Sequence, residues 1–429
     1  MRLTRTAALG AVLSLALAVT GCATSTQKTP QDDSKGKVTL RFQSLAFQAP
    51  TIKATKDIVA KWNADNPNVQ VKYVQGSWDS IQDQLVTQFQ GGTAPDIIQY
   101  ESAAMAQFAT QGYLADLSGT MSPEVKQSVP QAVWKTVTVD GKIIAAPTLL
   151  QSYLVFANRK LLQQAGVKIP TGSTWSWDDF QKAAKATTRN GTYGVAWGLD
   201  QPTASMLSLG LNFGGTYFTG TGKSAAINVG AKELALPERI HQMAYDDKSL
   251  DPVSITQSGG DALPLFLKGK AAMTVQGSYV AQTLSQTAPK GLDWVTMPAL
   301  KADSAAQAAD PQTLSVSAQS KNVADAAKFI NYYMQPDNLA KVAEGDWLIP
   351  ASTSAADAVR SDTGGKNGWS TILDSGKFLT EAPFQTATNY PQWKDQVATP
   401  AFQRYLGGKS SSSQLAQQLT AGWKSANGG

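Results

Sequence analysis

Residues 38–74, VTLRFQSLAFQAPTIKATKDIVAKWNADNPNVQVKYV, contain the pattern that decides the fold class. Residues 38–42 and 69–74 have the β-branched and aromatic composition typical of strands, whereas residues 52–66 have helical spacing and stop at Pro67. The alternation continues, with strands predicted at 96–98, 152–157, 193–197, 271–275 and 294–297 and helices at 177–188, 231–246 and 325–334. It predicts α/β layers built on largely parallel sheets.

The N-terminus has the order of a secretory signal. Arg2 and Arg5 form a basic head, and residues 7–19 are an apolar run that is short for a membrane span. We therefore expect residues 1–21 to be a signal peptide that is removed rather than folded.

Cys22 follows directly and is the only cysteine of the chain. The small residue before it resembles the bacterial lipobox, which implies a diacylglycerol on the sulfur of Cys22. Two or more acyl chains suffice for durable membrane anchoring. Residues 22–36, rich in Thr, Ser, Gln, Lys and Asp, are expected to form a flexible tether. An ordinary secretory signal with a buried Cys22 is the alternative.

The overall composition excludes one class of partner. The 429 residues carry a formal charge of +5, which falls to +3 without Arg2 and Arg5, and they contain no run of lysines or arginines. Nucleic-acid binding needs a concentrated basic stripe, so we expect no nucleic-acid partner. Only 16% of residues are charged, while Trp and Tyr number 11 and 12. Such a composition can line a wet cleft with flat rings and neutral hydrogen-bonding groups.

No catalytic constellation is evident. His241 is the only histidine, and neither a Gly-x-Ser-x-Gly elbow nor a His-Glu-x-x-His pair is present. We expect no catalytic residues, no metal and no cofactor. Paired carboxylates of a glycosidase stay an alternative, because the sequence cannot place any pair among Glu101, Asp178, Asp179, Asp200 and Glu344.

An ordered set of motifs resembles family 1 extracellular solute-binding proteins, the sugar receptors of ABC importers that are similar to maltose-binding protein. No single motif is diagnostic, but together they span nearly the whole mature chain. The motifs are Gly92-Thr93-Ala94-Pro95-Asp96-Ile97-Ile98, Gly112-Tyr113-Leu114-Ala115-Asp116-Leu117, Phe156-Ala157-Asn158-Arg159-Lys160-Leu161, Thr174-Trp175-Ser176-Trp177-Asp178-Asp179-Phe180, Phe266-Leu267-Lys268-Gly269-Lys270-Ala271-Ala272-Met273 and Ala326-Ala327-Lys328-Phe329-Ile330.

The resemblance implies a two-lobe periplasmic-binding-protein type II fold with three hinge crossovers and an interlobe ligand cleft. Residues 37–148 and 298–345 would form lobe 1, and residues 149–297 and 346–429 would form lobe 2. Ligand bound between the lobes would favour the closed state by its differential affinity for it.

The resemblance also implies ligand contacts. Tyr100 follows the strand at 96–98, where similar receptors carry a stacking aromatic, and Glu101 follows it. Gln151 occupies a position where relatives place a hydrogen-bonding acid or amide. The remaining implied contacts are Tyr279 with the adjacent Gln276, Trp393 as a late stacking tryptophan, and Trp347 in the third crossover.

Other candidates follow from position. Phe47 and Gln48 follow the first strand and would reach a cleft at its C-terminal edge, where α/β sheets place ligands. Trp78 starts a helix and is a candidate for either the cleft or lobe packing. Asp200 is expected near the cleft. Ala103 and Ala104 stand where maltose-type relatives have a charged pair, which argues against maltose as the ligand.

The sequence therefore predicts a lipid-anchored solute-binding subunit of an ABC importer at the outer face of the cell membrane. We expect a monomer that captures a sugar, an oligosaccharide, by lobe closure and delivers it to the permease. A receptor of this type for a non-sugar solute and an extracellular glycosidase are the alternatives.

Overall fold

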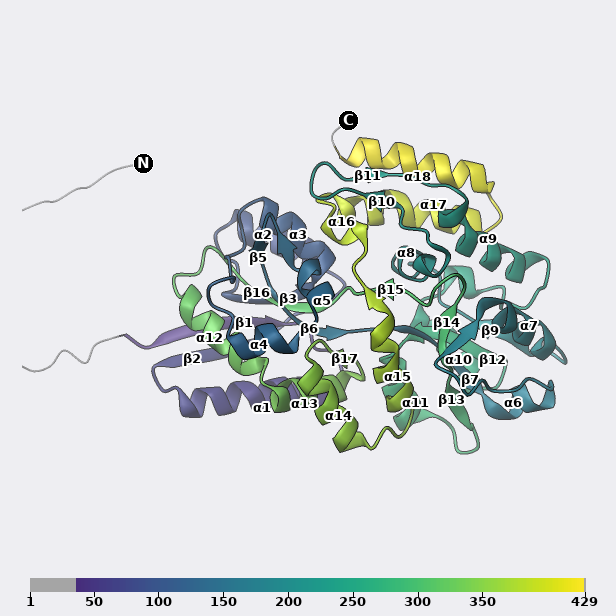
Figure 1. Ribbon diagram of the computed structural model, residues 1–429, viewed down its shortest axis with the longest axis horizontal. Coiled ribbons are helices and arrows are strands. Elements are labelled where there is room, and N and C mark those ends of the chain that lie inside the picture. The colour runs from purple at the N-terminus through teal and green to yellow at the C-terminus, as the bar shows by residue number, and fades with distance from the viewer. Residues whose placement is uncertain (1–35, 428–429) are drawn as a thin grey trace, which may run out of the picture. The chain divides into compact units, whose positions relative to one another are not determined.

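The computed structural model describes residues 36–427 and shows two separate β-sheets with helices packed on them (Figure 1). Cys22, the predicted signal peptide and all but Gly36 of the predicted tether lie outside the described residues. Among residues 36–427, no helix has the length and apolar character needed to cross a membrane.

The larger sheet has six strands. Their order is β17 (Ile349–Pro350), β6 (Ala146–Leu150), β16 (Gln312–Val316), β3 (Ile97–Glu101), β1 (Val38–Ser44) and β2 (Val69–Gln75). β1 is parallel to β2 and β3, but β16 is antiparallel to β3 and β6, and β17 is antiparallel to β6.

Both faces of this sheet are covered, because successive side chains point to opposite sides. Phe42 and Ile97 pack into a core shared with α1 (Ala49–Asp65), α12 (Val323–Tyr333) and α13 (Pro336–Asp346). Ile98, the next residue of β3, packs on the other face with α2 (Ile81–Gln90) and α3 (Ser102–Thr110). The sheet is therefore buried on both sides, as in other layered α/β proteins.

The second sheet has four strands in the order β13 (Trp294–Thr296), β7 (Tyr153–Asn158), β12 (Ala271–Gly277) and β9 (Tyr193–Ala196). β7 is antiparallel to both β12 and β13, and only β12 and β9 are parallel. Phe156 faces a core with α10 (Gly259–Leu267) and α11 (Val280–Thr287), whereas Val155 faces α7 (Trp177–Thr187).

The expectation of largely parallel sheets is wrong for both sheets. The strands β6, β16 and β17 are antiparallel to their neighbours, and all three lie next to passages of the chain between the two sheets. The chain passes from β6 to β7 through Gln151 and Ser152, and it returns between β13 and β16. β16 arrives from the second sheet, so it is not bound by the right-handed crossover that keeps βαβ strands parallel, and it runs antiparallel to β3 and β6.

Four short two-stranded pairs complete the strands of the described part of the chain. They are β4 (Thr138–Val139) with β5 (Lys142–Ile143), β8 (Thr174–Ser176) with β14 (Ala299–Lys301), β10 (Phe218–Thr219) with β11 (Ala226–Ile227), and β15 (Gln307–Ala308) with β18 (Leu379–Thr380). The pairing of β14 with β8 joins residues just after the second sheet to the region of α7. The lobe boundaries given above stay a prediction.

Serine side chains cap the starts of two helices. Ser176 begins α7 by accepting a hydrogen bond from the backbone N–H of Asp179, and Ser411 begins α18 (Ser412–Ala426) in the same way. The other α-helices are α4 (Pro123–Ser128), α5 (Gln131–Thr136), α6 (Arg159–Gln164), α8 (Thr203–Gly210), α9 (Ala231–Tyr245), α14 (Thr353–Thr363), α15 (Trp369–Ser375), α16 (Tyr390–Trp393) and α17 (Thr399–Leu406).

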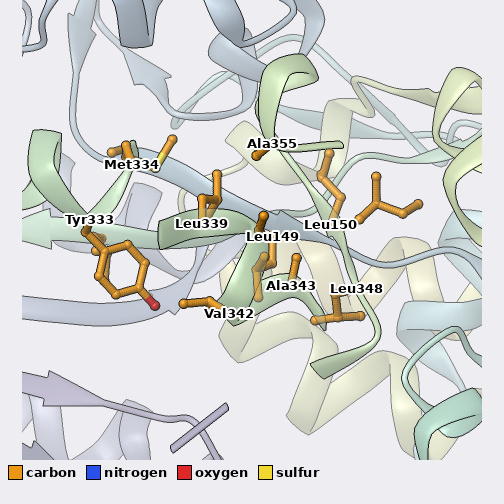
Figure 2. Packing of buried hydrophobic residues seen from close by; sticks show 14 of the residues in the cluster. Leu149, Leu150, Tyr333, Met334, Leu339, Val342, Ala343, Leu348 and Ala355 are labelled. Carbon is orange, nitrogen blue, oxygen red and sulfur yellow. The ribbon is translucent and has the colours of Figure 1, made fainter. Parts of the chain in front are cut away.

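Apolar side chains pack around the end of β6, where the chain crosses to β7 in the second sheet. Figure 2 shows Leu149 and Leu150 of β6 near Leu348 and near the α13 side chains Leu339, Val342 and Ala343. All six are buried. This packing fixes the end of β6 from which the chain crosses to β7.

Candidate functional site

A cavity of about 580 Å³ lies between residues of the two sheets. Its walls come mainly from positions that follow strands or lie in connections between the sheets. The lining residues are Leu45, Phe47, Gly76, Ser77, Trp78, Asp79, Glu101, Leu149, Gln151, Tyr153, Ala204, Ser208, Tyr279, Ala308, Asp310, Gln312, Asp346, Leu348, Phe384 and Tyr390. The volume falls in the range of about 300–1,000 Å³ typical of small-molecule sites.

The chain topology explains this convergence. β1, β2 and β3 are parallel neighbours, so their carboxyl ends share one edge of the larger sheet. Phe47 follows β1, Trp78 follows β2, and Glu101 ends β3. The opposite wall includes Tyr153 at the start of β7 and Tyr279, two residues after β12. The cavity therefore lies where α/β sheets place ligands.

Aromatic rings make up much of the wall. The rings of Phe47 and Tyr279 meet edge to face with centroids 6.4 Å apart, which joins the two walls directly. Phe47 is 58% exposed, unusual for so large an apolar side chain. The ring of Trp78 lies 6.0 Å from that of Tyr100 at a tilt of 45°. An exposed ring at the cavity edge can offer its face to an apolar ligand surface.

The most polar groups of the cavity wall are carboxyl groups. The Asp310 oxygen Oδ1 accepts hydrogen bonds from the Ser102 hydroxyl (2.8 Å) and from the Ala103 backbone N–H (3.2 Å). The Glu101 oxygen Oε1 lies 3.5 Å from the ammonium of Lys394. Burial, and then the nearby charge of Glu101, raise the pKa of Asp310 well above its usual range.

Asp346 ends α13, shortly before β17, and lines the cavity. It is 1% exposed, and its oxygen Oδ1 accepts a hydrogen bond from the Thr51 hydroxyl at 2.5 Å. Burial raises the pKa of Asp346 to about 6, opposed by the hydrogen bonds from Thr51 and Gln312. This carboxyl is thus held in an environment that disfavours its charge.

Five residues predicted from the sequence line the cavity together. They are Phe47, Trp78, Glu101, Gln151 and Tyr279. They come from five separate segments of the chain, and the fold brings them to one place. Contact with a ligand by any of them remains a prediction.

Three further predicted residues are buried beside the lining rather than in it. Gln48 donates its side-chain N–H to the Asp346 backbone carbonyl (3.3 Å), and Tyr100 is 8% exposed behind Trp78. Gln276 donates to the Gly259 carbonyl (2.9 Å). Their hydrogen bonds and packing support the wall.

The remaining three lie outside the lining. Trp347 is stacked on Trp369 with centroids 4.9 Å apart, and its backbone is left-handed with φ of 53°. Trp393 is fully buried and donates its indole N–H to a backbone carbonyl of α18, that of Leu419 (3.0 Å). The backbone carbonyl of Asp200 accepts a hydrogen bond from the Gln403 side chain.

The sequence reasoning missed four prominent lining residues: Tyr153, Asp310, Gln312 and Tyr390. Two of them had a usable signal. Tyr153 stands two positions after the predicted Gln151, and Tyr390 stands three positions before the predicted Trp393. Asp310 and Gln312 had none, because they belong to the return passage into β16.

His241 is not among the lining residues of the cavity. The His241 ring stacks on that of Tyr405, with centroids 5.2 Å apart, away from the cavity lining. Within residues 36–427 there is no group of three or more His, Cys, Asp or Glu side chains placed to hold a metal ion.

Comparison with known proteins identifies the family. The family model for bacterial extracellular solute-binding proteins matches residues 48–340. A protein of Streptomyces antibioticus named "Uncharacterized lipoprotein in oleD 5'region" is 40% identical over 404 residues, covering 93% of this chain and 88% of the relative. The maltooligosaccharide ABC transporter solute-binding lipoprotein of Streptococcus pneumoniae is 22% identical over 94% of this chain and 93% of its own length.

The fold is shared with solved structures. The GacH receptor of Streptomyces glaucescens superposes with a TM-score of 0.76 at 20% identity, covering 91% of this chain and 98% of the receptor. This likeness confirms the predicted two-lobe α/β fold of the periplasmic-binding-protein type II class. The family match and the lipoprotein relative together show that the chain belongs to the bacterial extracellular solute-binding protein family.

Proposed function

We propose that this protein is the lipid-anchored subunit of an ABC importer that captures an oligosaccharide outside the cell and delivers it to the permease. The observation that carries the proposal is the composition of the cavity. It combines aromatic side chains with carboxyl, amide and hydroxyl groups. Sugars present weakly polar C–H faces and hydroxyl edges, which these two kinds of group complement.

The relatives support a sugar as the cargo. The Streptococcus pneumoniae relative is named for maltooligosaccharide, and the GacH receptor was solved with acarbose and an acarbose homologue. The cavity volume supports a ligand of more than one sugar ring. Ala103 and Ala104 argue against maltose itself, so the linkage and length of the oligosaccharide are not carried over from these relatives.

Two contacts support capture by lobe closure. Phe47 meets Tyr279 across the cavity, and Glu101 of β3 pairs with Lys394 near the C-terminal helices. Contacts of this kind form only when the two walls approach one another. A ligand that touches both walls therefore binds the closed state more tightly and shifts the population toward it. The lobe boundaries, with hinges near 145–150, 297–300 and 346–350, are part of this proposal.

The cellular arrangement is part of the same proposal. Cys22 carries the lipid, residues 22–36 hold the receptor at the outer face of the membrane, and the receptor acts as a monomer that binds its ligand without turning it over. The lipoprotein relative, which covers most of this chain, supports the anchor. Palmitate labelling of the full-length chain in bacterial cells, lost in Cys22→Ser, tests it. Equal labelling of Cys22→Ser would refute it.

A thermal-shift panel tests the ligand class. Protein that begins at Lys37 is screened against mono- and oligosaccharides, amines and phosphate esters, and each stabilising compound is checked for turnover. Ligand at about 100 times its dissociation constant stabilises the fold by roughly 2.7 kcal/mol. We expect a shift with one class of oligosaccharide and no turnover. A shift with phosphate esters alone would favour the non-sugar receptor, and turnover would favour the glycosidase.

A further inference from the structure

The lining of the cavity, as formed by residues 36–427, contains several acids but no basic residue. Asp79, Glu101, Asp310 and Asp346 contribute four carboxyl groups to its wall. None of the lining residues found within the described part of the chain is Lys, Arg or His. A cleft lined by one sign of charge attracts ligands of the other sign.

Two of the lining acids, Glu101 and Asp310, form one acidic group with Asp395. Glu101 and Asp310 influence each other electrostatically, and Asp395 adds a third carboxyl near Glu101. Lys394 is the one cation that contacts this group among residues 36–427, and its ammonium lies 3.5 Å from Glu101. One ammonium therefore faces three carboxyl groups.

Asp310 has unused acceptor capacity. Its Oδ1 accepts from Ser102 and Ala103, while its other oxygen accepts no hydrogen bond from any residue in 36–427. Burial and the charge of Glu101 raise its pKa, as burial raises that of Asp346. Lys394 lowers the pKa of Asp310 only as the smallest of the effects on it, and its ammonium pairs with Glu101. A partly buried carboxylate with so weak a counter-charge is costly, and a cationic ligand group would offset that cost more fully than a hydroxyl would.

Aromatic side chains complete the environment. Tyr153, Tyr279 and Tyr390 line the same cavity, and burial raises the pKa of each phenol, so the hydroxyls stay neutral. Tyrosine faces attract cations, most strongly where water is excluded. Carboxylates beside tyrosine rings form a site suited to an ammonium group carried on a sugar ring.

Resting on the sugar-receptor function proposed above, we propose that the ligand is an amine-bearing saccharide whose ammonium group binds near Glu101 and Asp310. The sugar ring stacks on the aromatic wall, and the ammonium supplies the positive charge that the lining lacks. The receptor then distinguishes an amino sugar from its hydroxyl or acetamido counterpart by charge as well as by shape.

The test is calorimetric titration with matched saccharides at about pH 6, where sugar amines are protonated and Glu is largely ionised in water. Glucosamine oligomers are compared with N-acetylglucosamine oligomers and cello-oligosaccharides of the same length. A second series compares maltotriose with its 6-amino-6-deoxy derivative, and spermidine serves as an amine without a sugar. The amine-bearing saccharide is expected to bind about tenfold or more tightly than its neutral partners.

Matched variants separate charge from shape. Asp310→Asn keeps an oxygen for Ser102 and Ala103 but removes the charge, so the preference for the amine should fall to about threefold or less. Asp140→Asn removes an exposed carboxyl outside the lining, in a turn with φ of 50° that suits Asn, and should leave the preference unchanged. Titrations in buffers of different ionisation enthalpy should show proton release with the amine, because a cation lowers the pKa of a neighbouring carboxyl.

The outcomes are distinguishable. Neutral saccharides that bind as tightly as their amino counterparts, or an undiminished amine preference in Asp310→Asn, would overturn this inference and leave the sugar receptor intact. Spermidine that binds more tightly than every saccharide would overturn both proposals. Absence of binding by all the saccharides would refute the sugar receptor, and this inference with it.

Discussion

The buried carboxyl of Asp346 predicts a pH-dependent gain in stability on replacement by Asn. Its pKa rises from an ordinary value of 3.8 to about 6 on folding. The folded protein therefore binds more protons than the unfolded chain between these values, and stability is lost as the pH rises through the folded pKa. A difference of about two units at 1.36 kcal/mol each gives a cost of roughly 3 kcal/mol above that pKa.

Asp346→Asn removes the ionisation while its side-chain oxygen still accepts from Thr51. The hydrogen bond from Gln312 loses an acceptor, which offsets part of the gain. We expect the variant to be more stable by about 1–3 kcal/mol near pH 8, with the gain reduced by about half near pH 5 and lost near pH 4. Urea unfolding of both proteins across this range, with slopes compared, measures the effect.

Asp140→Asn is the control, because it removes an exposed carboxyl and should change stability by less than about 0.5 kcal/mol at every pH. A gain in Asp346→Asn that does not change with pH would refute the reasoning. Destabilisation near pH 8 would refute it as well, since it would mean that the charged carboxyl is better solvated than its burial implies.

Three other substitutions separate binding from stability. Gly277→Ala would place a methyl group 2.5 Å from the Tyr279 ring and 2.9 Å from the Gln151 oxygen, so we expect calorimetry to show weaker ligand binding in a folded protein. Trp393→Phe loses one buried hydrogen bond and leaves a small cavity, so it should lower the free energy of unfolding by about 2–4 kcal/mol in urea titrations, with ligand affinity kept. Phe47→Ala should weaken ligand binding but hardly change the thermal unfolding temperature, because this ring is 58% exposed. Equal effects of Trp393→Phe and Phe47→Ala on affinity would contradict both assignments.

The sequence contained much of the local structure. Strand composition identified β1 and β7 closely. Ser176 and Ser411, which cap their helices, are residues of a type that favours helix starts. α1 begins at Ala49, three residues before the predicted helix, with Pro50 in its first turn. Proline fits that position because its missing N–H would have no helical partner there.

Strand direction could not be predicted in the same way. The antiparallel placement of β6 and β16 depends on passages between two sheets, and no local pattern in residues 146–150 or 312–316 records it. The family resemblance supplied the two-lobe fold, whereas alternation of strands and helices alone predicted parallel sheets.

The lining residues that directly follow strands could be predicted from the sequence. Phe47 and Trp78 line the cavity because they follow parallel neighbours whose ends share an edge. Asp310 was missed because its position depends on the return passage between the lobes. In α16, the residue predicted to contact the ligand was Trp393. In the structure Tyr390 lines the cavity instead, whereas Trp393 packs beside Phe218. Sequence could not tell which face of a one-turn helix meets the cavity.

Titration of the stabilising oligosaccharide into wild-type protein and Tyr279→Ala tests the central claim most directly. If the sugar binds in the cavity between the lobes, the wild type binds it with one site per chain. Loss of the Tyr279 ring then weakens binding by about tenfold or more, or roughly 1.4 kcal/mol, with the fold retained. Unchanged affinity in a folded Tyr279→Ala protein would place the sugar elsewhere and contradict the account.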